Sequence, residues 1–351
     1  MVKGKEMQKL HQILENAMHG QSPGKEDCIY LLSFDETSIE ASFIRSVGNE
    51  IVRKRTGNSA AIAGQIGISV SECNGGCKFC TFGAGHTTFA PVCLTDEEIH
   101  KKVSEFCDKD DLHTLLFMTM HDYDVDHFLN AVKIAKSIIH PSTNIRANVG
   151  DTDIDTFREM KKAGVDGVYH VWRIGEGIDT DLQPKDRLKT IQNALDAGLC
   201  VCTCCEPIGP EHSPETLVEH IFAGINFGCT QLGAMRRVAV PGTPLAKHGQ
   251  ISELRLAQIV AVVAVAHPNI SICGVHEPNK IAYTSGANCI TAESGANPRD
   301  NAADTKRGRG LDMNDCRKYL LECGFSNLMR GDGSKIPLTF EYATLKAGEK
   351  V

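Results

Sequence analysis

Short apolar runs alternate with amphipathic segments along most of the chain, starting near residue 64. The runs are rich in Val, Ile, Leu and Cys, a composition typical of strands buried in a parallel sheet. They predict strands at 66–70, 114–118, 145–148, 167–169, 199–203, 231–235, 270–274 and 289–292. The intervening segments repeat their apolar positions at helical spacing and predict helices at 96–107, 125–138, 154–163, 185–197, 214–227 and 254–267.

Eight strands separated by helices predict an α/β protein with a closed (β/α)8 barrel of the TIM type, whereas six strands would leave a partial barrel. Residues 6–56 show a helical pattern, so we expect residues 1–60 to form an N-terminal helical extension that covers the bottom of the barrel. The barrel then spans 61–300. Residues 301–351 form a C-terminal loop and helix extension, with a mobile loop at 306–310 and a helix at 312–323.

The composition fits a soluble globular protein, with 351 residues, 42% hydrophobic and 23% charged, and a formal net charge of -7. Mild acidity without a basic cluster argues against a nucleic-acid partner, and no apolar run is long enough to cross a membrane. Fifteen cysteines are present, yet the first residues carry no secretory signal. We therefore expect a cytoplasmic protein whose thiols are metal ligands, catalytic groups or small buried residues.

A glycine-rich loop after the first strand holds three cysteines, Cys73, Cys77 and Cys80. Three thiolates on one tight loop can hold three corners of an iron–sulfur cube, because Gly75 and Gly76 let the backbone curl around it. The fourth corner is then left without a protein ligand. An open iron can bind a chelating substrate or cofactor, as a catalytic zinc does with its free position.

Two other interpretations of this loop remain open. His86 or Cys93 could supply a fourth ligand and complete a zinc site or a four-thiolate electron-transfer cluster. A zinc ribbon would carry a second Cys-x2-Cys pair, which the sequence lacks. The three cysteines could also be unrelated structural residues.

The spacing Cys-x3-Cys-x2-Cys, with the aromatic Phe79 before the last Cys, resembles the signature of the radical S-adenosylmethionine superfamily. This resemblance implies a [4Fe-4S] cluster on the three cysteines, with S-adenosylmethionine chelated to the fourth iron and its adenine beside Phe79. It also implies reductive cleavage to a 5′-deoxyadenosyl radical that abstracts hydrogen from a C–H bond. A flavodoxin- or ferredoxin-type electron donor and an anaerobic cell follow from the same resemblance.

Further cofactor contacts are expected at strand ends. In this superfamily the segment after the second strand binds the amino group of S-adenosylmethionine, and Met118 and Thr119 occupy that position here. The Gly-Gly-Glu-like sequence that the superfamily carries there is absent from this chain. A carboxylate can accept hydrogen bonds from both hydroxyls of a ribose. The planar guanidinium of an arginine can donate two parallel hydrogen bonds to a carboxylate. By resemblance to biotin synthase and the hydrogenase maturases, Glu176 contacts the cofactor and Arg187 reaches its carboxylate. The alternative is that Glu176 and Arg187 are part of an exposed, salt-bridged helix start without a role in cofactor binding.

The fifth strand carries Cys200, Cys202 and Cys204 on one face, which we expect to be the barrel interior. It resembles the fifth strand of biotin synthase, which leads into a turn along the adenine; Ile208 lies in that turn. Cys202 falls on the cysteine that helps bind a second cluster in that family. We therefore predict an auxiliary [4Fe-4S] cluster on a different thiol set, with Cys229 in reserve; the alternative is that these are barrel-filling residues. The predicted set is Cys202, Cys204, Cys205 and Cys273.

Charged residues at the last strand ends are candidates for substrate binding. Arg236 and Arg237 could clamp a carboxylate, but only one can face inward if both lie on the strand. His276 and Glu293 end adjacent strands and could contact substrate or carry protons. A hydrogen-bonded pair without a catalytic role is the alternative. No catalytic side chain is assigned.

The leading functional hypothesis is sulfur insertion into an aliphatic C–H bond, with the auxiliary cluster as sulfur donor. The resemblance implies a lipoyl synthase of the two-protein type, or else a biotin synthase, acting on a small-molecule or carrier-bound acyl substrate, with a second radical S-adenosylmethionine protein as partner. One alternative is carbon-skeleton rearrangement or cofactor maturation, resembling methylornithine synthase or the [FeFe]-hydrogenase maturase. A non-catalytic iron–sulfur carrier or scaffold is the alternative from another class.

Overall fold

A closed parallel barrel forms the centre of the molecule. The computed structural model describes residues 2–229, 231–267, 269–276 and 279–345. Eight parallel strands follow one another around the barrel, and the last pairs with the first, with Cys289 opposite Ala61. The barrel is therefore closed, and a partial barrel is excluded. The strands are β1 (Ser59–Gly67), β4 (Leu112–Met118), β5 (Asn144–Asn148), β6 (Gly167–Tyr169), β7 (Cys200–Cys202), β9 (Gln231–Arg236), β10 (Ile272–Gly274) and β11 (Cys289–Ser294).

The first strand differs from its predicted position. β1 begins well before residue 66 and ends at Gly67, after which the chain turns into a two-residue strand, β2 (Ser69–Val70). Small residues fill the start of β1, so the apolar run that marks a strand in the sequence appears only near its end. A further short strand, β8 (Cys205–Ile208), continues β7 and runs parallel to β9.

Helices cover the outside of the barrel, and their starts follow from the sequence. Ser, Thr or Asp side chains cap the amino ends of α4, α5, α6, α8 and α9 by accepting backbone N–H groups. The predicted helices are present with ends within a few residues of the predicted ones. They are α4 (Asp96–Ser104), α5 (Val125–Lys136), α6 (Ile154–Ala163), α7 (Pro184–Asp196), α8 (Pro214–Asn226) and α9 (Glu253–Ala266), followed by the short α10 (Lys280–Tyr283).

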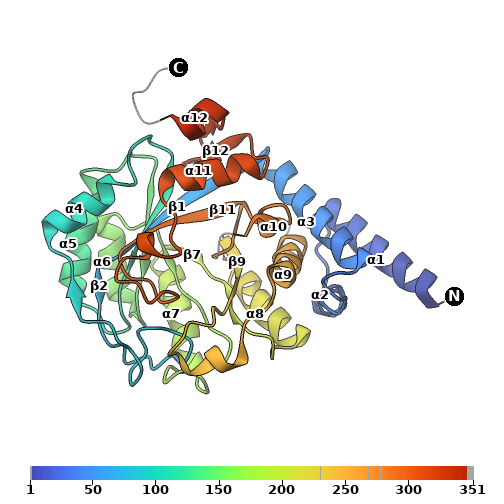
Figure 1. Ribbon diagram of the computed structural model, residues 1–351, viewed down its shortest axis with the longest axis horizontal. Helices are drawn as coiled ribbons and strands as arrows, with labels where there is room; N and C mark the ends of the chain where they lie inside the picture. Colours follow the sequence, from blue (N-terminus) through green and yellow to red (C-terminus); the bar gives the residue numbers. More distant parts are fainter. Residues whose placement is uncertain (1, 230, 268, 277–278, 346–351) are drawn as a thin grey trace.

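The N-terminal helices lie on the flank of the barrel, so their expected position over its bottom is wrong. They are α1 (Val2–Met18), α2 (Lys25–Leu32) and α3 (Ile39–Thr56), and Figure 1 shows them beyond α8 and α9. At Gly48 of α3 an added Cβ would come within 2.9 Å of Ala261 in α9, so only glycine allows this close approach. This covering explains why α9 is buried on all sides.

C-terminal elements cover part of the lower end of the barrel. β12 (Asn327–Met329) runs beside the start of β1 and forms a hairpin with β13 (Lys335–Pro337). The hairpin turn is fixed under β4 and β5, where Arg330 donates to the Asp110 carbonyl and Asn144 donates to the Gly331 carbonyl. α11 (Met313–Glu322) and α12 (Phe340–Thr344) complete the described tail; residues 346–351 of the predicted extension lie outside the described part.

The start of the segment predicted as a mobile loop lies in a 3₁₀ turn, η2 (Thr305–Arg307), and the region is held by several contacts. Asp304 accepts the Gly295 N–H, and the Arg309 guanidinium donates to Glu293 at 3.0 Å. Among the described residues, no helix has both the length and the apolar composition needed to cross a membrane.

Candidate active site

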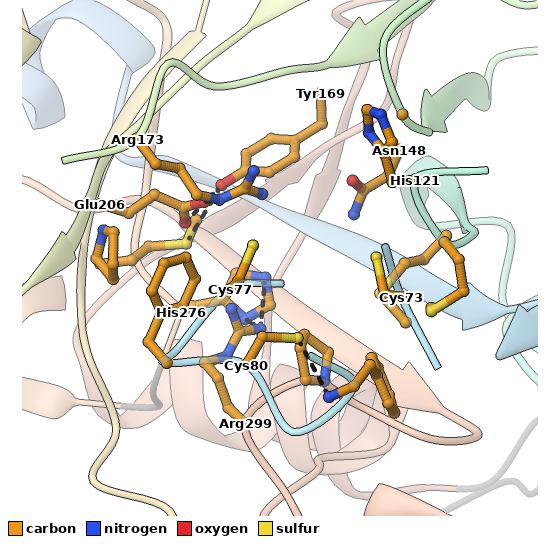
Figure 2. A pocket seen from close by; sticks show the side chains of 18 of the residues that line it. Cys73, Cys77, Cys80, His121, Asn148, Tyr169, Arg173, Glu206, His276 and Arg299 are labelled. Carbon is orange, nitrogen blue, oxygen red and sulfur yellow. Dashed lines mark hydrogen bonds and ion pairs between the residues drawn. The ribbon is translucent and has the colours of Figure 1, made fainter. Parts of the chain in front are cut away.

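A large pocket opens at the carboxyl ends of the barrel strands, where enzymes of this architecture carry out their chemistry. The space that it encloses is about 1120 Å³, which includes open solvent at its mouth. Cys73, Cys77 and Cys80 line it, and Figure 2 shows them below Tyr169 and Arg173 in the view.

The loop that carries the three cysteines is fixed by its own backbone. Cys73 donates its N–H to the Phe82 carbonyl at 2.8 Å and accepts from the Ala84 N–H at 3.1 Å. Gly76 adopts a φ of 57°, a conformation that other residues avoid. The Lys78 N–H donates to the Asp179 carbonyl, which joins the loop to the segment after β6. These contacts keep all three thiols at the pocket.

The thiols themselves are suited to binding an electropositive group. Burial raises the pKa of Cys77 to about 11 and that of Cys80 to about 12, so each thiol must lose a proton to bind a metal as a thiolate. The Phe82 N–H donates to the Cys80 sulfur at 3.4 Å, a contact that stabilises a cluster-bound thiolate. Binding of iron would therefore release protons.

The candidates for a fourth ligand point elsewhere. The His86 Nε2 atom is 2.7 Å from the Cys80 carbonyl oxygen, and the exposed Cys93, in β3 (Val92–Cys93), lies 3.5 Å from the His127 ring. Within the described ranges, no three His, Cys, Asp or Glu side chains gather closely enough for a single metal ion. Zinc requires such a close set, whereas a cluster spaces its thiolates further apart. The donor set thus fits an iron–sulfur cluster with three protein ligands.

Of the predicted cofactor contacts, Phe79, Met118 and Thr119 line the pocket. The Met118 carbonyl accepts the Ile68 N–H at 3.0 Å, and the Thr119 N–H donates to the Asn148 carbonyl at 3.1 Å. This part of the wall is therefore rigid. His121, which the sequence did not single out, also lines the pocket, and its buried Nδ1 atom has no partner among the described residues.

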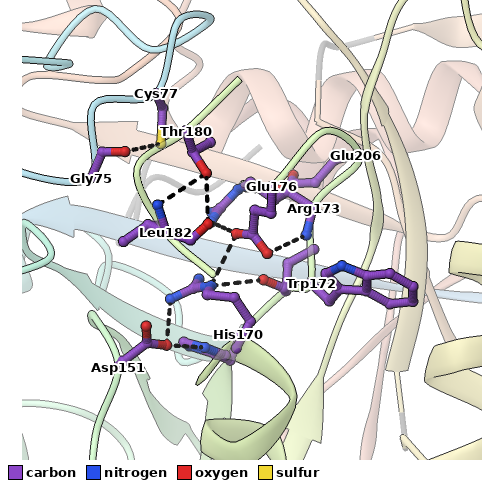
Figure 3. Close-up of polar contacts among 12 residues, drawn as sticks. Gly75, Cys77, Asp151, His170, Trp172, Arg173, Glu176, Thr180, Leu182 and Glu206 are labelled. Atoms are coloured by element: carbon purple, nitrogen blue, oxygen red, sulfur yellow. Dashed lines mark hydrogen bonds and ion pairs between the residues drawn. The ribbon is translucent and has the colours of Figure 1, made fainter. Parts of the chain in front are cut away.

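Glu176 and Arg187 form a buried ion pair with each other. Their Oε1 and Nε atoms are 3.0 Å apart, and Glu176 also accepts the Arg173 N–H at 3.1 Å. Arg187 lines the pocket, whereas Glu176 does not. Figure 3 shows Glu176 next to Arg173, with Asp151 and His170 further along the same group of polar contacts. The two residues are salt-bridged, as in the alternative to the predicted cofactor contacts, but the pair is buried instead of exposed. In this arrangement Glu176 orients two arginines and does not face the pocket.

The ion pairs continue on both sides of this pair. Arg173 donates to Glu206 at 2.9 Å, and the Tyr169 hydroxyl donates to the same carboxylate at 2.8 Å. On the other side, Asp151 accepts from Arg187 at 2.8 Å. Burial raises the pKa of Asp151, but the His170 hydrogen bond and the Arg187 charge outweigh it and hold that pKa below its usual range. A continuous buried network therefore fixes one wall of the pocket.

Ile208 does not line the pocket. It is 1% exposed and belongs to the core between the sheet and the outer helices, while Glu206 and Pro207 face the pocket from the same strand. An adenine contact in this turn would therefore be made by Glu206 or Pro207 and not by Ile208.

The four thiols predicted for an auxiliary cluster are divided between two faces of the sheet. Cys202 and Cys204 face the barrel interior, where Cys204 packs with Tyr169 and Met235. Cys205 and Cys273 instead belong to the core outside the sheet, and the Cys205 thiol donates to the Leu217 carbonyl of α8. Successive side chains alternate between faces, so Cys204 and Cys205 cannot point the same way. The reserve thiol, Cys229, also lies in the outer core.

Both arginines at the end of β9 line the pocket, but they are not equivalent. Arg237 is 2% exposed and its two terminal nitrogens are bound by the Glu211 carboxylate. The terminal nitrogens of Arg236 have only the Ile251 carbonyl at 3.2 Å and a partly exposed Glu253 at 3.7 Å. The buried Nε atoms of both arginines have no described partner. Arg236 is therefore the better candidate for a ligand.

His276 and Glu293 come together as predicted, with two arginines that the sequence did not assign. The Glu293 Oε1 atom lies 3.4 Å from His276 Nδ1, and Arg299 Nη2 lies 2.5 Å from the same ring nitrogen. Burial and the charges of Arg299 and Arg309 hold the pKa of His276 well below its usual range. A neutral His276 can therefore accept a hydrogen bond from Arg299 at the pocket edge.

Comparison with protein families assigns the chain's middle part. Residues 68–223 match the model described as "Radical SAM superfamily". A biotin synthase of Desulforudis audaxviator is 27% identical over 232 residues, which cover 64% of this chain and 70% of that protein. A biotin synthase of Desulfatibacillum aliphaticivorans is 24% identical over 320 residues, covering 86% of this chain and 97% of that protein.

Solved structures share the fold at low sequence identity. Methylornithine synthase (PylB) has a TM-score of 0.77 at 17% identity, covering 89% of this chain and 96% of its own. The [FeFe]-hydrogenase maturase HydG from Carboxydothermus hydrogenoformans has a TM-score of 0.75 at 14% identity, covering 94% of this chain and 82% of its own.

Proposed function

Because this chain carries a radical SAM domain and belongs with the biotin synthase-like group of radical SAM proteins, we propose that it activates an aliphatic C–H bond of a carboxylate-bearing molecule and inserts sulfur there. The match of residues 68–223 to the radical SAM family supports a radical SAM enzyme. The observation that carries the proposal is the loop with three thiols at the pocket, from which both candidates for a fourth ligand turn away.

Cys73, Cys77 and Cys80 would hold the [4Fe-4S] cluster. When bound, the reduced cluster and S-adenosylmethionine supply a 5′-deoxyadenosyl radical that removes hydrogen from the substrate. Arg187 would bind the carboxylate of the cofactor, because its fork faces the pocket while Glu176 fixes its orientation. An electron donor of the flavodoxin or ferredoxin type is part of this proposal.

The substrate would be recognised through its carboxylate. Arg236 has an unpartnered nitrogen and only a partly exposed acid nearby, so a bound carboxylate would complete its contacts. Glu206, held by Tyr169 and Arg173, would exclude a second anionic group from the opposite wall. His276 and Glu293 would line the far edge, where the neutral imidazole can exchange a hydrogen bond with the substrate.

Sulfur insertion is supported by thiols below the pocket. Cys204 packs directly under Tyr169 and Met235, both of which line the pocket, and Cys202 lies further down the same face. An acyl chain attached to a carrier, or a free acid of similar length, could reach this floor. In this proposal the enzyme acts with a second radical SAM protein, as in a two-protein lipoyl synthase.

A second candidate function omits the sulfur. The separation of Cys205 and Cys273 from Cys202 and Cys204 favours a rearrangement or cofactor-maturation reaction, because no auxiliary cluster can form on the originally predicted set. A non-catalytic iron–sulfur scaffold is a third candidate, and the formation of 5′-deoxyadenosine separates it from both enzymes.

The test uses anaerobically reconstituted, reduced protein with S-adenosylmethionine. 5′-Deoxyadenosine is expected from the wild type and not from Cys77→Ala. Its absence in both would support the non-catalytic iron–sulfur scaffold. An octanoylated lysyl peptide and dethiobiotin are then supplied in turn, each with deuterium at the target carbon. Deuterium transfer to 5′-deoxyadenosine together with sulfur in the product supports the proposal. Transfer without sulfur supports the second candidate.

A further inference from the structure

Three thiols follow one another along the inner face of the barrel. Leu199 and Val201 point outward into the core against the helices, so Cys200 and Cys202, which alternate with them, point inward. Cys204 continues this face, because it packs with the pocket residues Tyr169 and Met235. Cys200 and Cys202, two positions apart on β7, are about 6.6 Å from each other. Cys204 follows in the short link before β8, so the three thiols form a ladder.

This ladder leads from the lower end of the barrel to the floor of the pocket. Cys200, at the start of β7, is exposed, Cys202 is partly exposed, and Cys204 is only 3% exposed. Leu116 and Thr291, which face inward from β4 and β11, also keep part of their surface accessible. The middle of the barrel is therefore not completely filled by side chains.

A buried arginine lies beside the middle thiol. Arg146 of β5 is 5% exposed and donates from Nη1 to Gln231, whose Cα is paired with that of Cys202 in the adjacent strand. Gln231 thereby links the Arg146 guanidinium to the strand position beside Cys202. The Nε atom of Arg146 has no partner, and in the described part of the chain no carboxylate lies within ion-pair distance of this arginine.

Such an arginine requires an anion. A charged group buried without a counter-ion costs several kcal/mol, so sites of this kind normally hold a bound or covalent negative charge. The groups that face the same interior are thiols, Cys202 on β7 and also Cys289 at the start of β11. A plain thiol there leaves the positive charge uncompensated.

We propose that Cys202 and Arg146 form a site for sulfane sulfur, in which Cys202 carries a persulfide that is loaded through Cys200 from the lower end of the barrel. The terminal sulfur of a persulfide is more acidic than a thiol and would supply the anion that Arg146 lacks. This inference rests on the proposed sulfur insertion, because it names the source of the sulfur.

The transfer balances without any oxidant or reductant. The Cys200 thiolate attacks the terminal sulfur of a donor persulfide, the donor S–S bond breaks, and the donor leaves as a thiol with one proton. The Cys202 thiolate then attacks the terminal sulfur on Cys200 in the same way, which returns Cys200 to a thiol. The transferred sulfur keeps its oxidation state throughout.

The test loads the full-length, cluster-reconstituted protein with glutathione persulfide, followed by alkylation and peptide mass spectrometry. We expect a persulfide on Cys202 in the wild type, loss of it in Cys202→Ser, and at least about tenfold less in Arg146→Leu, with recovery in Arg146→Lys. Cys200→Ser should slow the loading of Cys202 by a similar factor. Cys205→Ser is the matched control, since that thiol points outward from the same strand.

Two results would overturn the inference. One is equal labelling of Cys202 in wild type and Arg146→Leu. The other is additional iron and sulfide that depend on Cys202, which would assign the site to a second cluster. Formation of 5′-deoxyadenosine and the iron content of the first cluster are measured in every variant to detect misfolding. If Cys202 is loaded but no product contains sulfur, the storage site stands and the proposed sulfur insertion fails.

Discussion

The Nε atom of Arg187 lies 3.0 Å from Oε1 of Glu176, and both side chains are buried, with 4% and 0% exposure. Burial raises the pKa of Glu176, while Arg187 and Arg173 lower it. Because the Glu176 side chain has no contact with solvent, its negative charge is stabilised mainly by Arg187 and Arg173. The pair therefore sets the position of Arg187 at the pocket wall.

Glu176→Gln should weaken cofactor binding more than the chemical step. We expect the KM for S-adenosylmethionine to rise about tenfold with a smaller change in kcat, because Arg187 loses its orientation. The free energy of unfolding should fall by about 1–3 kcal/mol. Kinetics of 5′-deoxyadenosine formation and urea unfolding measure the two effects. Asp155→Asn, which breaks an exposed pair with Arg158, is the control and should change stability by less than about 1 kcal/mol.

Stability should decline on mild acidification because of His170. This residue is 2% exposed, and burial together with Arg187 lowers its pKa to about 3. The unfolded chain binds a proton near pH 6.5, so the folded state loses relative stability as the pH falls from about 6.5 to 3. Urea unfolding of His170→Gln should show a flatter dependence in that range. A slope equal to that of the wild type would contradict the expectation.

Each of Cys73→Ala, Cys77→Ala and Cys80→Ala should lower the iron content of the cluster and the formation of 5′-deoxyadenosine at least about a hundredfold, since each removes one of the three thiols at the pocket. Iron analysis and chromatography of the reaction check this. Cys93→Ala removes an exposed thiol at 3.5 Å from His127 and should keep both properties. Loss of iron in Cys93→Ala would restore the four-ligand interpretation.

The two neighbouring arginines of the pocket should respond differently to truncation. Arg236→Ala should raise the substrate KM with little change in stability. Arg237→Ala should lower the free energy of unfolding by about 1 kcal/mol, since its partner Glu211 is partly exposed, with a side-chain exposure of 39%. A substrate KM that rises only in Arg237→Ala would assign the carboxylate to the other residue.

Removal of Arg317 should be strongly destabilising. Its side chain and that of Asp111 are both 0% exposed, at 2.7 Å from each other. Arg317→Met leaves Asp111 buried without its counter-ion, at a cost of about 3–5 kcal/mol measured by denaturant unfolding. The double variant with Asp111→Asn should regain part of that loss, and no recovery would mean that the packing of Arg317 matters more than its charge.

The order of strands and helices could be predicted from the sequence because the barrel repeats a strand followed by a helix. Each repeat is visible in the sequence as a short apolar run followed by an amphipathic segment. The flank position of α1–α3 could not be predicted, since an amphipathic helix shows which face is buried but not what buries it. The same holds for the hairpin of β12 and β13, whose partner β1 is far away in the sequence.

The cysteines show how much of the site can be predicted from the alternation of side chains along a strand. It correctly predicts that Cys202 and Cys204 share the interior face, and applied to Glu293 it would also have predicted an inward Cys289. The outward position of Cys205 follows from the same rule. Arg146 could not be identified, because the absence of a counter-ion becomes visible only when the surroundings of a side chain are known.

The closure of the barrel between Ala61 and Cys289 has a consequence for biosynthesis. As the ribosome releases the chain, β1 appears early and its final partner β11 appears near the end. Until then the strands can form only an open, curled sheet with two unpaired edges. The ladder of Cys200, Cys202 and Cys204 faces the side of that sheet that will become enclosed. It is therefore accessible from the open seam during translation and only from the two ends of the barrel afterwards.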